Sequence, residues 1–185
     1  MLIDITLSIT PEMTECSPTD RSNPLAGHLG THFDVMNKEF PLEYTCRKGI
    51  IFDVSGVTGR DISPADVDTE LIGRDMFIGF FSGYIEAVPY GSKGYFSNHP
   101  QLSDELIELL LDRGVSIIGL DFAGIRRGKE HTPKDAYCAD RGTFVVENLC
   151  NLKEIVAGGG RFTAHTYPMS YTDVTGLPCR VIAEI

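Results

Sequence analysis

The segment "GHLGTHFDV", residues 27–35, places three side chains that commonly bind metal within seven positions: His28, His32 and Asp34. Histidine nitrogen and carboxylate oxygen are the usual ligands of a catalytic divalent cation, and such a site commonly takes three protein ligands, which leaves room for water. The chain has five histidines, so two of them lie in this short segment. The segment is therefore a candidate metal site.

The spacing of these residues is compatible with a site built on a strand. If His32 to Asp34 is extended, the two-residue period of a strand puts both side chains on one face. A turn at Gly30 and Thr31 could then bring His28 back toward them. The helical zinc motif H-E-x-x-H does not apply, because glycine and threonine occupy its inner positions. Spacing alone leaves open the alternative of two surface histidines near an aspartate.

Outward from this segment, the chain contains more expected strands than helices. Apolar runs rich in β-forming residues predict about seven strands: 1–10, 49–56, 75–84, 115–124, 142–149, 161–169 and 179–185. Helical patterns occur at 63–72, 102–114 and 132–142. Strands and helices do not alternate regularly, so a mixed sheet or barrel with helices packed outside is favoured over a doubly wound fold.

Each expected helix begins with a capping signal. Ser103 precedes Asp104 and Glu105, which suit the positive end of a helix. The other two begin with a hydroxyl cap, then proline, then an aspartate three residues after the cap: Ser63, Pro64 and Asp66, and Thr132, Pro133 and Asp135.

Length and composition predict one domain, residues 1–185, with no repeat or linker. A net charge of −10 argues against nucleic acid and anionic lipid as partners. No apolar segment approaches the roughly 20 residues of a membrane span, and the N-terminus lacks a signal-peptide pattern, so a cytoplasmic location is expected. The five cysteines are widely spaced without C-x-x-C, which predicts free, mostly buried thiols.

The motif "HLGTHFD" (28–34) resembles the H-x-G-T-H-x-D signature of the cyclase family, the metal-dependent hydrolases that include bacterial kynurenine formamidase and isatin hydrolase. The resemblance continues in order and covers nearly the whole chain. It runs through "DITLSI" (4–9), "YFSNHPQLSDELIELLLDRGVSIIGLDFAG" (95–124), "GTFVVENLCNL" (142–152) and "GLPCRVIAEI" (176–185).

This resemblance implies a mixed α/β fold of the swivelling β/β/α type, a barrel-like mixed sheet with helices outside, assembled into homo-oligomers (dimers or tetramers). It also implies one or two divalent cations beneath the motif loop. The family's ligand positions carry over to His28, His32 and Asp34, and a later glutamate carries over to Glu147. A glutamate inside "TFVVENL" would otherwise be a buried unpaired charge, costing several kcal/mol by a rough estimate. The alternative is a strand-end residue that faces water.

Two departures from the family pattern matter. The motif usually continues as D-x-P-x-H, with the last histidine as proton shuttle, but here Met36 and Lys38 occupy those positions. A lysine with a pKa of about 10.4 could donate a proton or stabilise an oxyanion but is a poor base unless desolvated; a solvent-facing lysine is the alternative. A further family histidine corresponds to Asp135, which could ligate or merely cap a helix, and His131 is a rival ligand.

The expected function is therefore a metal-dependent hydrolase that uses a metal-activated water to open a C–N or C–O bond of a small cyclic amide, lactone or formamide. Glu147 or Asp135 could accept the proton, and Lys38 could assist the tetrahedral anion. The histidine pair favours zinc, and manganese remains open because carboxylates take part. No other cofactor is expected, and His99 and His165 are interpreted as structural. The rivals are a non-hydrolytic metal- or ligand-binding protein of the same fold and a purely structural oligomer.

Overall fold

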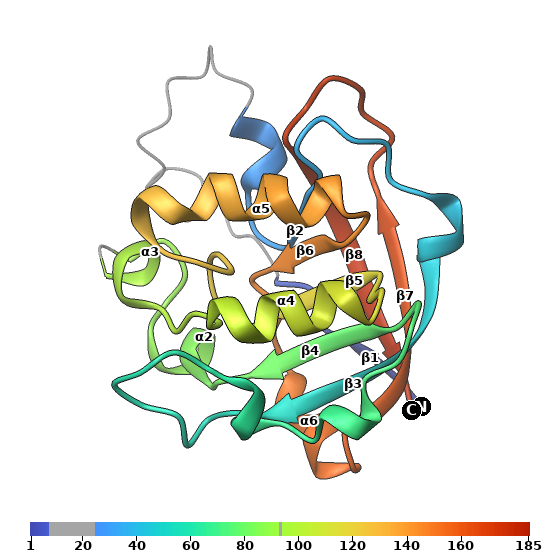
Figure 1. Ribbon diagram of the computed structural model, residues 1–185. Coiled ribbons are helices and arrows are strands. Elements are labelled where there is room, and N and C mark those ends of the chain that lie inside the picture. The colour runs from blue at the N-terminus through green and yellow to red at the C-terminus, as the bar shows by residue number, and fades with distance from the viewer. Residues whose placement is uncertain (8–24, 93) are drawn as a thin grey trace.

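The computed structural model describes residues 1–7, 25–92 and 94–185. Their strands form one sheet with helices outside it, which confirms the expected fold class (Figure 1). The strands are β1 (Leu2–Asp4), β2 (His32–Asp34), β3 (Cys46–Asp53), β4 (Phe77–Phe81), β5 (Ile117–Leu120), β6 (Phe144–Glu147), β7 (Arg161–Pro168) and β8 (Gly176–Glu184). All seven expected strands are present, and β2 is an eighth, formed by the histidine segment. Residues 8–10 of the expected first strand lie outside the described residues.

The sheet closes into a ring. Its strand order is β1-β8-β2-β6-β5-β4-β3-β7, and β7 pairs back to β8. Strands β3 to β6 are joined by parallel pairings, and the remaining pairings are antiparallel. Strand β1 adds to β8 outside the ring, so the first and last strands of the chain belong to the same sheet. The two termini meet there, with the Met1 amino group 2.6 Å from the Ile185 carbonyl.

Both sides of the ring are buried. Side chains alternate along each strand, so successive residues enter two different cores. In β4, Phe77 and Phe81 belong to the core inside the ring, whereas Ile78 and Phe80 belong to the core under the outer helices. Glycine makes room inside, since a Cβ on Gly119 would lie 2.5 Å from the Phe77 ring. Near-continuous apolar strands are typical of such doubly covered sheets.

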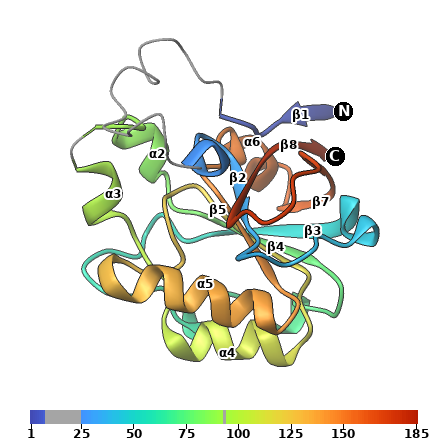
Figure 2. The ribbon, with the colours of Figure 1, turned by 90° about the horizontal axis from the view of Figure 1, so that it is seen from above.

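The helices are α2 (Tyr84–Ala87), α3 (Tyr95–Asn98), α4 (Asp104–Asp112), α5 (His131–Asp140) and α6 (Leu152–Ala157). Short 3₁₀ turns are η1 (Leu25–His28), η2 (Leu42–Thr45), η3 (Pro64–Asp66), η4 (Thr69–Leu71) and η5 (Gly128–Glu130). Helices α4 and α5 lie side by side over the outer face of the sheet (Figures 1 and 2). Three ion pairs join them: Lys134 pairs with Asp104, and Arg141, the C-cap of α5, pairs with Asp112 and Glu108.

The three capping signals had different outcomes. The Ser103 hydroxyl accepts from the Leu106 amide, so the predicted start of α4 is confirmed. Ser63 donates its amide to Asp66, but this segment forms two 3₁₀ turns in place of one helix. The predicted cap at Thr132 is wrong, because η5 leads directly into α5 and the helix begins at His131. Asp135 therefore lies inside the helix, where it is buried.

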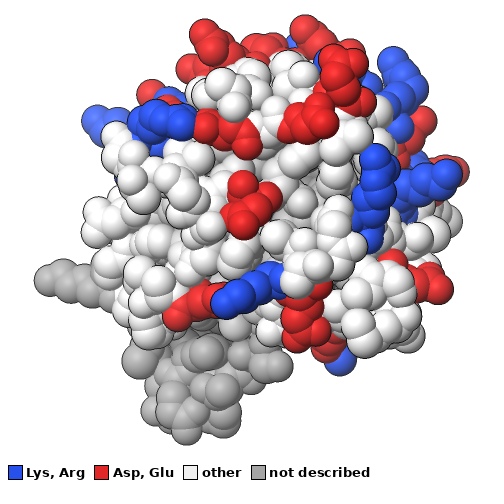
Figure 3. Space-filling model, turned by 90° about the horizontal axis from the view of Figure 1, so that it is seen from below, with Lys and Arg blue, Asp and Glu red and all other residues white. Residues whose placement is uncertain are grey.

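Acidic and basic side chains are interspersed on the face shown in Figure 3, which has no continuous basic patch among its described residues. None of the helices in the described ranges combines the length and the apolar character needed to cross a membrane. The four described cysteines are free, with Cys138 and Cys179 buried, Cys150 partly buried and Cys46 exposed. Cys16 lies outside the described residues.

Candidate functional site

Strands β2 and β6 bring three of the predicted residues to one face of the sheet. They pair antiparallel with His32 opposite Glu147 and Asp34 opposite Val145. The side chain of Phe33, between them, points into the core of the ring. His32, Asp34 and Glu147 consequently face outward, toward α5, and all three are buried. The predicted extended conformation of His32 to Asp34 is confirmed.

The N-terminal half of α5 covers this face with two more of the predicted residues. His131 Nε2 lies 3.0 Å from Glu147 Oε1 and 3.1 Å from Asp135 Oδ2. His131 and Asp135 are four residues apart, so they share one face of the helix. The imidazole is 35% exposed, while the Asp135 carboxylate is buried. His131 thus forms the solvent-facing edge of the cluster.

A turn returns His28 to the cluster, as the sequence predicts. Gly30 has a φ of 68°, and His28 Nδ1 lies 3.0 Å from Asp34 Oδ1. The other ring nitrogen lies 2.8 Å from the Thr175 hydroxyl. The imidazole packs closely on Gly176, where a Cβ would lie 2.7 Å from it. Sequence reasoning missed Thr175 and Gly176, at the start of β8, because the tertiary pairing of β8 with β2 brings them to the site.

These contacts bring together two overlapping sets of atoms of the kinds that can bind a metal. Ligand atoms of His28, His32 and Asp34 lie within 4.8 Å of one another, and so do those of Asp34, His131 and Asp135. Asp34 belongs to both sets. Glu147 lies between them, since its Oε2 is 3.6 Å from His32 Nε2 and its Oε1 contacts His131. The six predicted candidates other than Lys38 therefore converge.

The cluster concentrates three buried carboxylates. Burial, together with the charge of Asp34, raises the pKa of Glu147 and of Asp135 well above their ordinary values. Burial of the His32 ring opposes its protonation, but the hydrogen bond and charge of Asp34 and the charge of Glu147 raise the pKa of His32 to about 9. Despite its burial, hydrogen bonds from His28 and His32 hold the pKa of Asp34 well below its usual range. The negative charge of these buried carboxylates therefore favours the binding of a cation.

Two carboxylate oxygens support this interpretation. Among the residues that the structure describes, Asp34 Oδ2 and Asp135 Oδ1 are buried and lack a hydrogen-bond partner. Leaving a buried charged acceptor unsatisfied is costly, whereas a divalent cation takes such oxygens as ligands. The mixture of imidazole and carboxylate donors suits zinc or manganese. The residues present therefore fit a divalent cation.

A polar network behind the cluster holds the motif loop. The Gly30 carbonyl accepts from the Asn148 side chain and lies 2.9 Å from His32 Nδ1. The Thr31 hydroxyl donates to the Asn148 carbonyl, and the Tyr95 hydroxyl donates to the Asn148 side chain. The motif's glycine and threonine thus order the loop. Asn148 and Tyr95 were missed as supporting residues, although Asn148 directly follows Glu147 in sequence.

We expect Asn148→Ala to destabilise the protein by about 2–4 kcal/mol, because it leaves the Tyr95 hydroxyl without its acceptor, removes one of the two contacts of the Gly30 carbonyl and places alanine at a left-handed φ of 59°. Urea unfolding of the metal-free protein measures this. Asn37→Ala is the matched control, since Asn37 is exposed and has a φ of 64°, so it should cost only about 1 kcal/mol. Equal losses in the two variants would contradict the assigned role of the network.

Lys38 is the predicted residue that the structure does not bring to the cluster. Its ammonium lies 2.6 Å from Asp140 Oδ1, and both side chains are largely exposed. Asp140 is the last residue of α5, whereas His131 and Asp135 lie toward its start. At 1.5 Å per residue, Asp140 lies roughly 13 Å along the helix from His131. Positive φ values at Met36 and Asn37 turn the chain between Asp34 and Lys38.

The two remaining histidines have structural partners, as expected. His99 is buried, stacks on Phe122 and lies 2.7 Å from the Pro100 carbonyl. His165 lies on β7, 2.9 Å from Glu184 on β8. Cys138 is also in the core, under the outer helices.

Both sequence and fold match known proteins. A family profile described as "Putative cyclase" matches residues 3–126. A search of curated proteins gives no match. A potential metal-dependent hydrolase with cyclase activity shares 20% identity and a TM-score of 0.75, covering 99% of this chain and 98% of that one. A predicted metal-dependent hydrolase from Bacillus stearothermophilus shares 19% identity and a TM-score of 0.75, covering 99% of this chain and 97% of that one. Isatin hydrolase A from Labrenzia aggregata, bound to benzyl benzoate, shares 18% identity and a TM-score of 0.74, covering 99% of this chain and 93% of that one. At these identities the likeness establishes a shared fold.

Proposed function

This chain belongs to the cyclase family, and from that premise we propose that it is a metal-dependent hydrolase of a small carbonyl compound. The observation that carries the proposal is the convergence of buried imidazole and carboxylate groups around two oxygens without hydrogen-bond partners in the described chain, Asp34 Oδ2 and Asp135 Oδ1. The structural neighbours described as metal-dependent hydrolases support it. The substrate class we propose is a cyclic amide, a lactone or a formamide.

The proposed ligands form two groups with Asp34 in common. His28, His32 and Asp34 would hold one divalent cation, and Asp34, His131 and Asp135 would hold a second, with Glu147 between them. The histidines favour zinc, and the three carboxylates keep manganese open. When bound, such a cation supplies a Lewis acid that polarises a carbonyl and makes water a stronger acid.

The chain's own residues would handle the proton. Asp135 and Glu147 are buried carboxylates of the cluster that would hold the cations, so either lies where a general base is needed. His131 Nε2 contacts both of them and its ring reaches solvent. We assign to Asp135 or Glu147 the acceptance of a proton from the attacking water. The same carboxylate can then pass that proton to the leaving nitrogen or oxygen.

The proposed function is tested by metal content and by turnover. Elemental analysis of protein from cells supplied with zinc and manganese should find one or two divalent ions per chain. A panel of formamides, lactones and cyclic imides, assayed with each metal, should contain at least one compound that the protein hydrolyses. Adding a chelator should stop that hydrolysis. A metal-free protein would refute the metal site.

The panel also separates the main rival, a protein of this fold that binds metal or ligand without turnover. The observation favouring the rival is that Lys38, at the family's shuttle position, is paired with Asp140. Inactivity on the whole panel with metal verified in the site would favour it. If the protein is active, Lys38→Met should keep its rate within about three-fold, because an exposed ion pair contributes little.

We further propose that residues 1–185 form one domain, supported by the pairing of β1 with β8, and that the protein is a dimer or tetramer. Light scattering coupled to size-exclusion chromatography measures the oligomeric state.

A further inference from the structure

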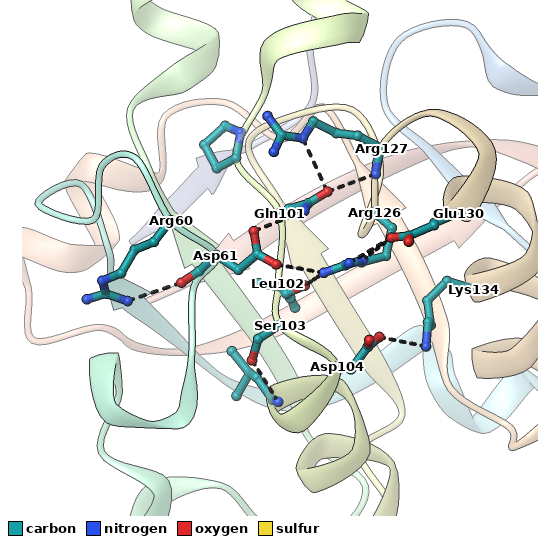
Figure 4. A network of polar contacts seen from close by, with 12 residues as sticks. Arg60, Asp61, Gln101, Leu102, Ser103, Asp104, Arg126, Arg127, Glu130 and Lys134 are labelled. Carbon is teal, nitrogen blue, oxygen red and sulfur yellow. Dashed lines mark hydrogen bonds and ion pairs between the residues drawn. The ribbon is translucent and has the colours of Figure 1, made fainter.

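A partly buried arginine, Arg126, ties the loop before α5 to two neighbouring segments (Figure 4). The Arg126 side chain is only 11% exposed. Its Nη1 donates to Asp61 Oδ2 at 2.9 Å and to the Leu102 carbonyl at 2.8 Å. Its Nε and Nη2 both donate to Glu130 Oε2, at 2.9 and 2.7 Å. One guanidinium thus joins three parts of the chain.

Two of these three parts form a well-connected anchor. Ile62 and Leu102 pair as a bridge, and the Leu102 amide donates to the Ile125 carbonyl. The remaining oxygen of Asp61 accepts from the Gln101 side chain. The Gln101 oxygen in turn accepts from Arg127, as Figure 4 shows. Arg126 is therefore held firmly on the side away from α5.

The third part, Glu130, directly precedes the His131 of the candidate metal cluster. Glu130 is the residue before α5 begins, and no side-chain cap holds this end of the helix. His131 is the most exposed imidazole of the cluster, so its placement depends on this turn. Gly124 lies against it, since a Cβ there would come within 3.0 Å of the imidazole. The loop from Gly124 to Glu130 thus forms the support of His131.

We propose that Arg126 is a positioning residue: through Glu130 it fixes the start of α5 and holds the His131 imidazole between Glu147 and Asp135. The inference rests on the proposed function, because Arg126 acts on metal binding through His131. Lysine cannot replace it, since a single ammonium cannot span Asp61, Leu102 and Glu130 with the fixed fork of a guanidinium. Supporting residues of this kind tune ligand placement and thereby metal affinity.

A double-mutant cycle distinguishes positioning from general support of the fold. The proteins are the wild type, Arg126→Met, His131→Ala and the double variant, all prepared metal-free. Titration calorimetry with Mn²⁺ and with Zn²⁺ gives their dissociation constants. Arg126→Met should weaken binding by about 10- to 100-fold when His131 is present. In the His131→Ala background the same change should weaken binding less than about three-fold, because the two effects share one route.

Two further variants complete the test. Glu130→Ala leaves Arg126 with Asp61 and Leu102 and removes only its link to α5, so it should reproduce the weakening even if Arg126→Met folds poorly. Arg141→Met is the matched control. Arg141 lies at the far end of α5 from His131, and the substitution breaks its ion pair with Asp112 of α4. It should leave the dissociation constants within about two-fold.

Weakening of equal size with and without His131, or unchanged affinity in Glu130→Ala, would overturn the positioning role alone. Equal weakening by Arg141→Met would also overturn it, since any loosening of α5 would then suffice. A wild-type protein that binds neither Mn²⁺ nor Zn²⁺ would overturn the proposed function, and this inference with it.

Discussion

His32→Ala is expected to weaken divalent metal binding by more than about 100-fold, because it removes a donor itself and not merely a supporting group. His32 lies opposite Glu147 in the β2–β6 pair and faces both Glu147 and Asp34. Without its nitrogen, one of the two ligand sets keeps only His28 and Asp34. Calorimetric titration with Zn²⁺ and Mn²⁺ measures the loss, and elemental analysis after purification should find the site depleted.

The same substitution should also lower the stability of the metal-free protein. His32 is buried and its raised pKa reflects a positive charge set against Asp34 and Glu147. Removing one partner of a buried charge pair costs about 3–5 kcal/mol. His165→Ala is the control, because His165 also pairs with a glutamate but on β7, and it should leave metal affinity unchanged. Unchanged metal affinity in His32→Ala, with stability alone reduced, would overturn the metal site.

Asp135→Asn is expected to have opposite effects on the metal-free and the metal-loaded protein. The Asp135 carboxylate is buried near Asp34 and Glu147, and one of its oxygens lacks a hydrogen-bond partner among the described residues. A neutral amide removes this repulsion, so the metal-free protein should gain about 1–3 kcal/mol in free energy of unfolding. The stabilisation that added metal confers should shrink, because an anionic ligand is lost.

Urea unfolding of both proteins, in chelator and in excess Mn²⁺, measures the two effects together. Asp104→Asn is the matched control. Asp104 is an exposed carboxylate on α4 that pairs with Lys134, the neighbour of Asp135 on α5. Asp104→Asn should change the free energy of unfolding by less than about 1 kcal/mol, both in chelator and in excess Mn²⁺. If Asp135→Asn destabilised the metal-free protein and left the effect of Mn²⁺ intact, Asp135 would be a structural residue and not a ligand.

The comparison of Asp135 with Lys38 shows where sequence reasoning succeeded and failed. Both were candidates because of their positions relative to the family pattern. The capping pattern at Thr132 gave Asp135 a plausible local role, yet the N-cap of α5 is Glu130, two residues earlier, and Asp135 faces β2 and β6. Lys38 is only four residues from Asp34, yet its partner is the far end of α5. Neither outcome follows from neighbouring residues.

The sequence by itself determined the local geometry of the motif. A two-residue period aligns His32 with Asp34, and a glycine with positive φ turns the chain so that His28 returns; both follow from covalent geometry over a few residues. The alternation of apolar residues likewise determined most of the strands. Burial of apolar side chains then made these strands part of a core, whichever elements were to cover them.

Only the tertiary structure decided which groups complete the site. Glu147 meets His32 through strand pairing, and α5 brings His131 and Asp135 because its inner face, with Cys138 and Ala139, is buried against the sheet. The same packing directs Lys38 to Asp140, and it lets Arg126 reach Asp61 and Glu130. Except for the pair of Arg126 with Glu130, these contacts join residues far apart in the chain. Their geometry is set by the free energy of packing the whole core, which no short stretch of sequence contains.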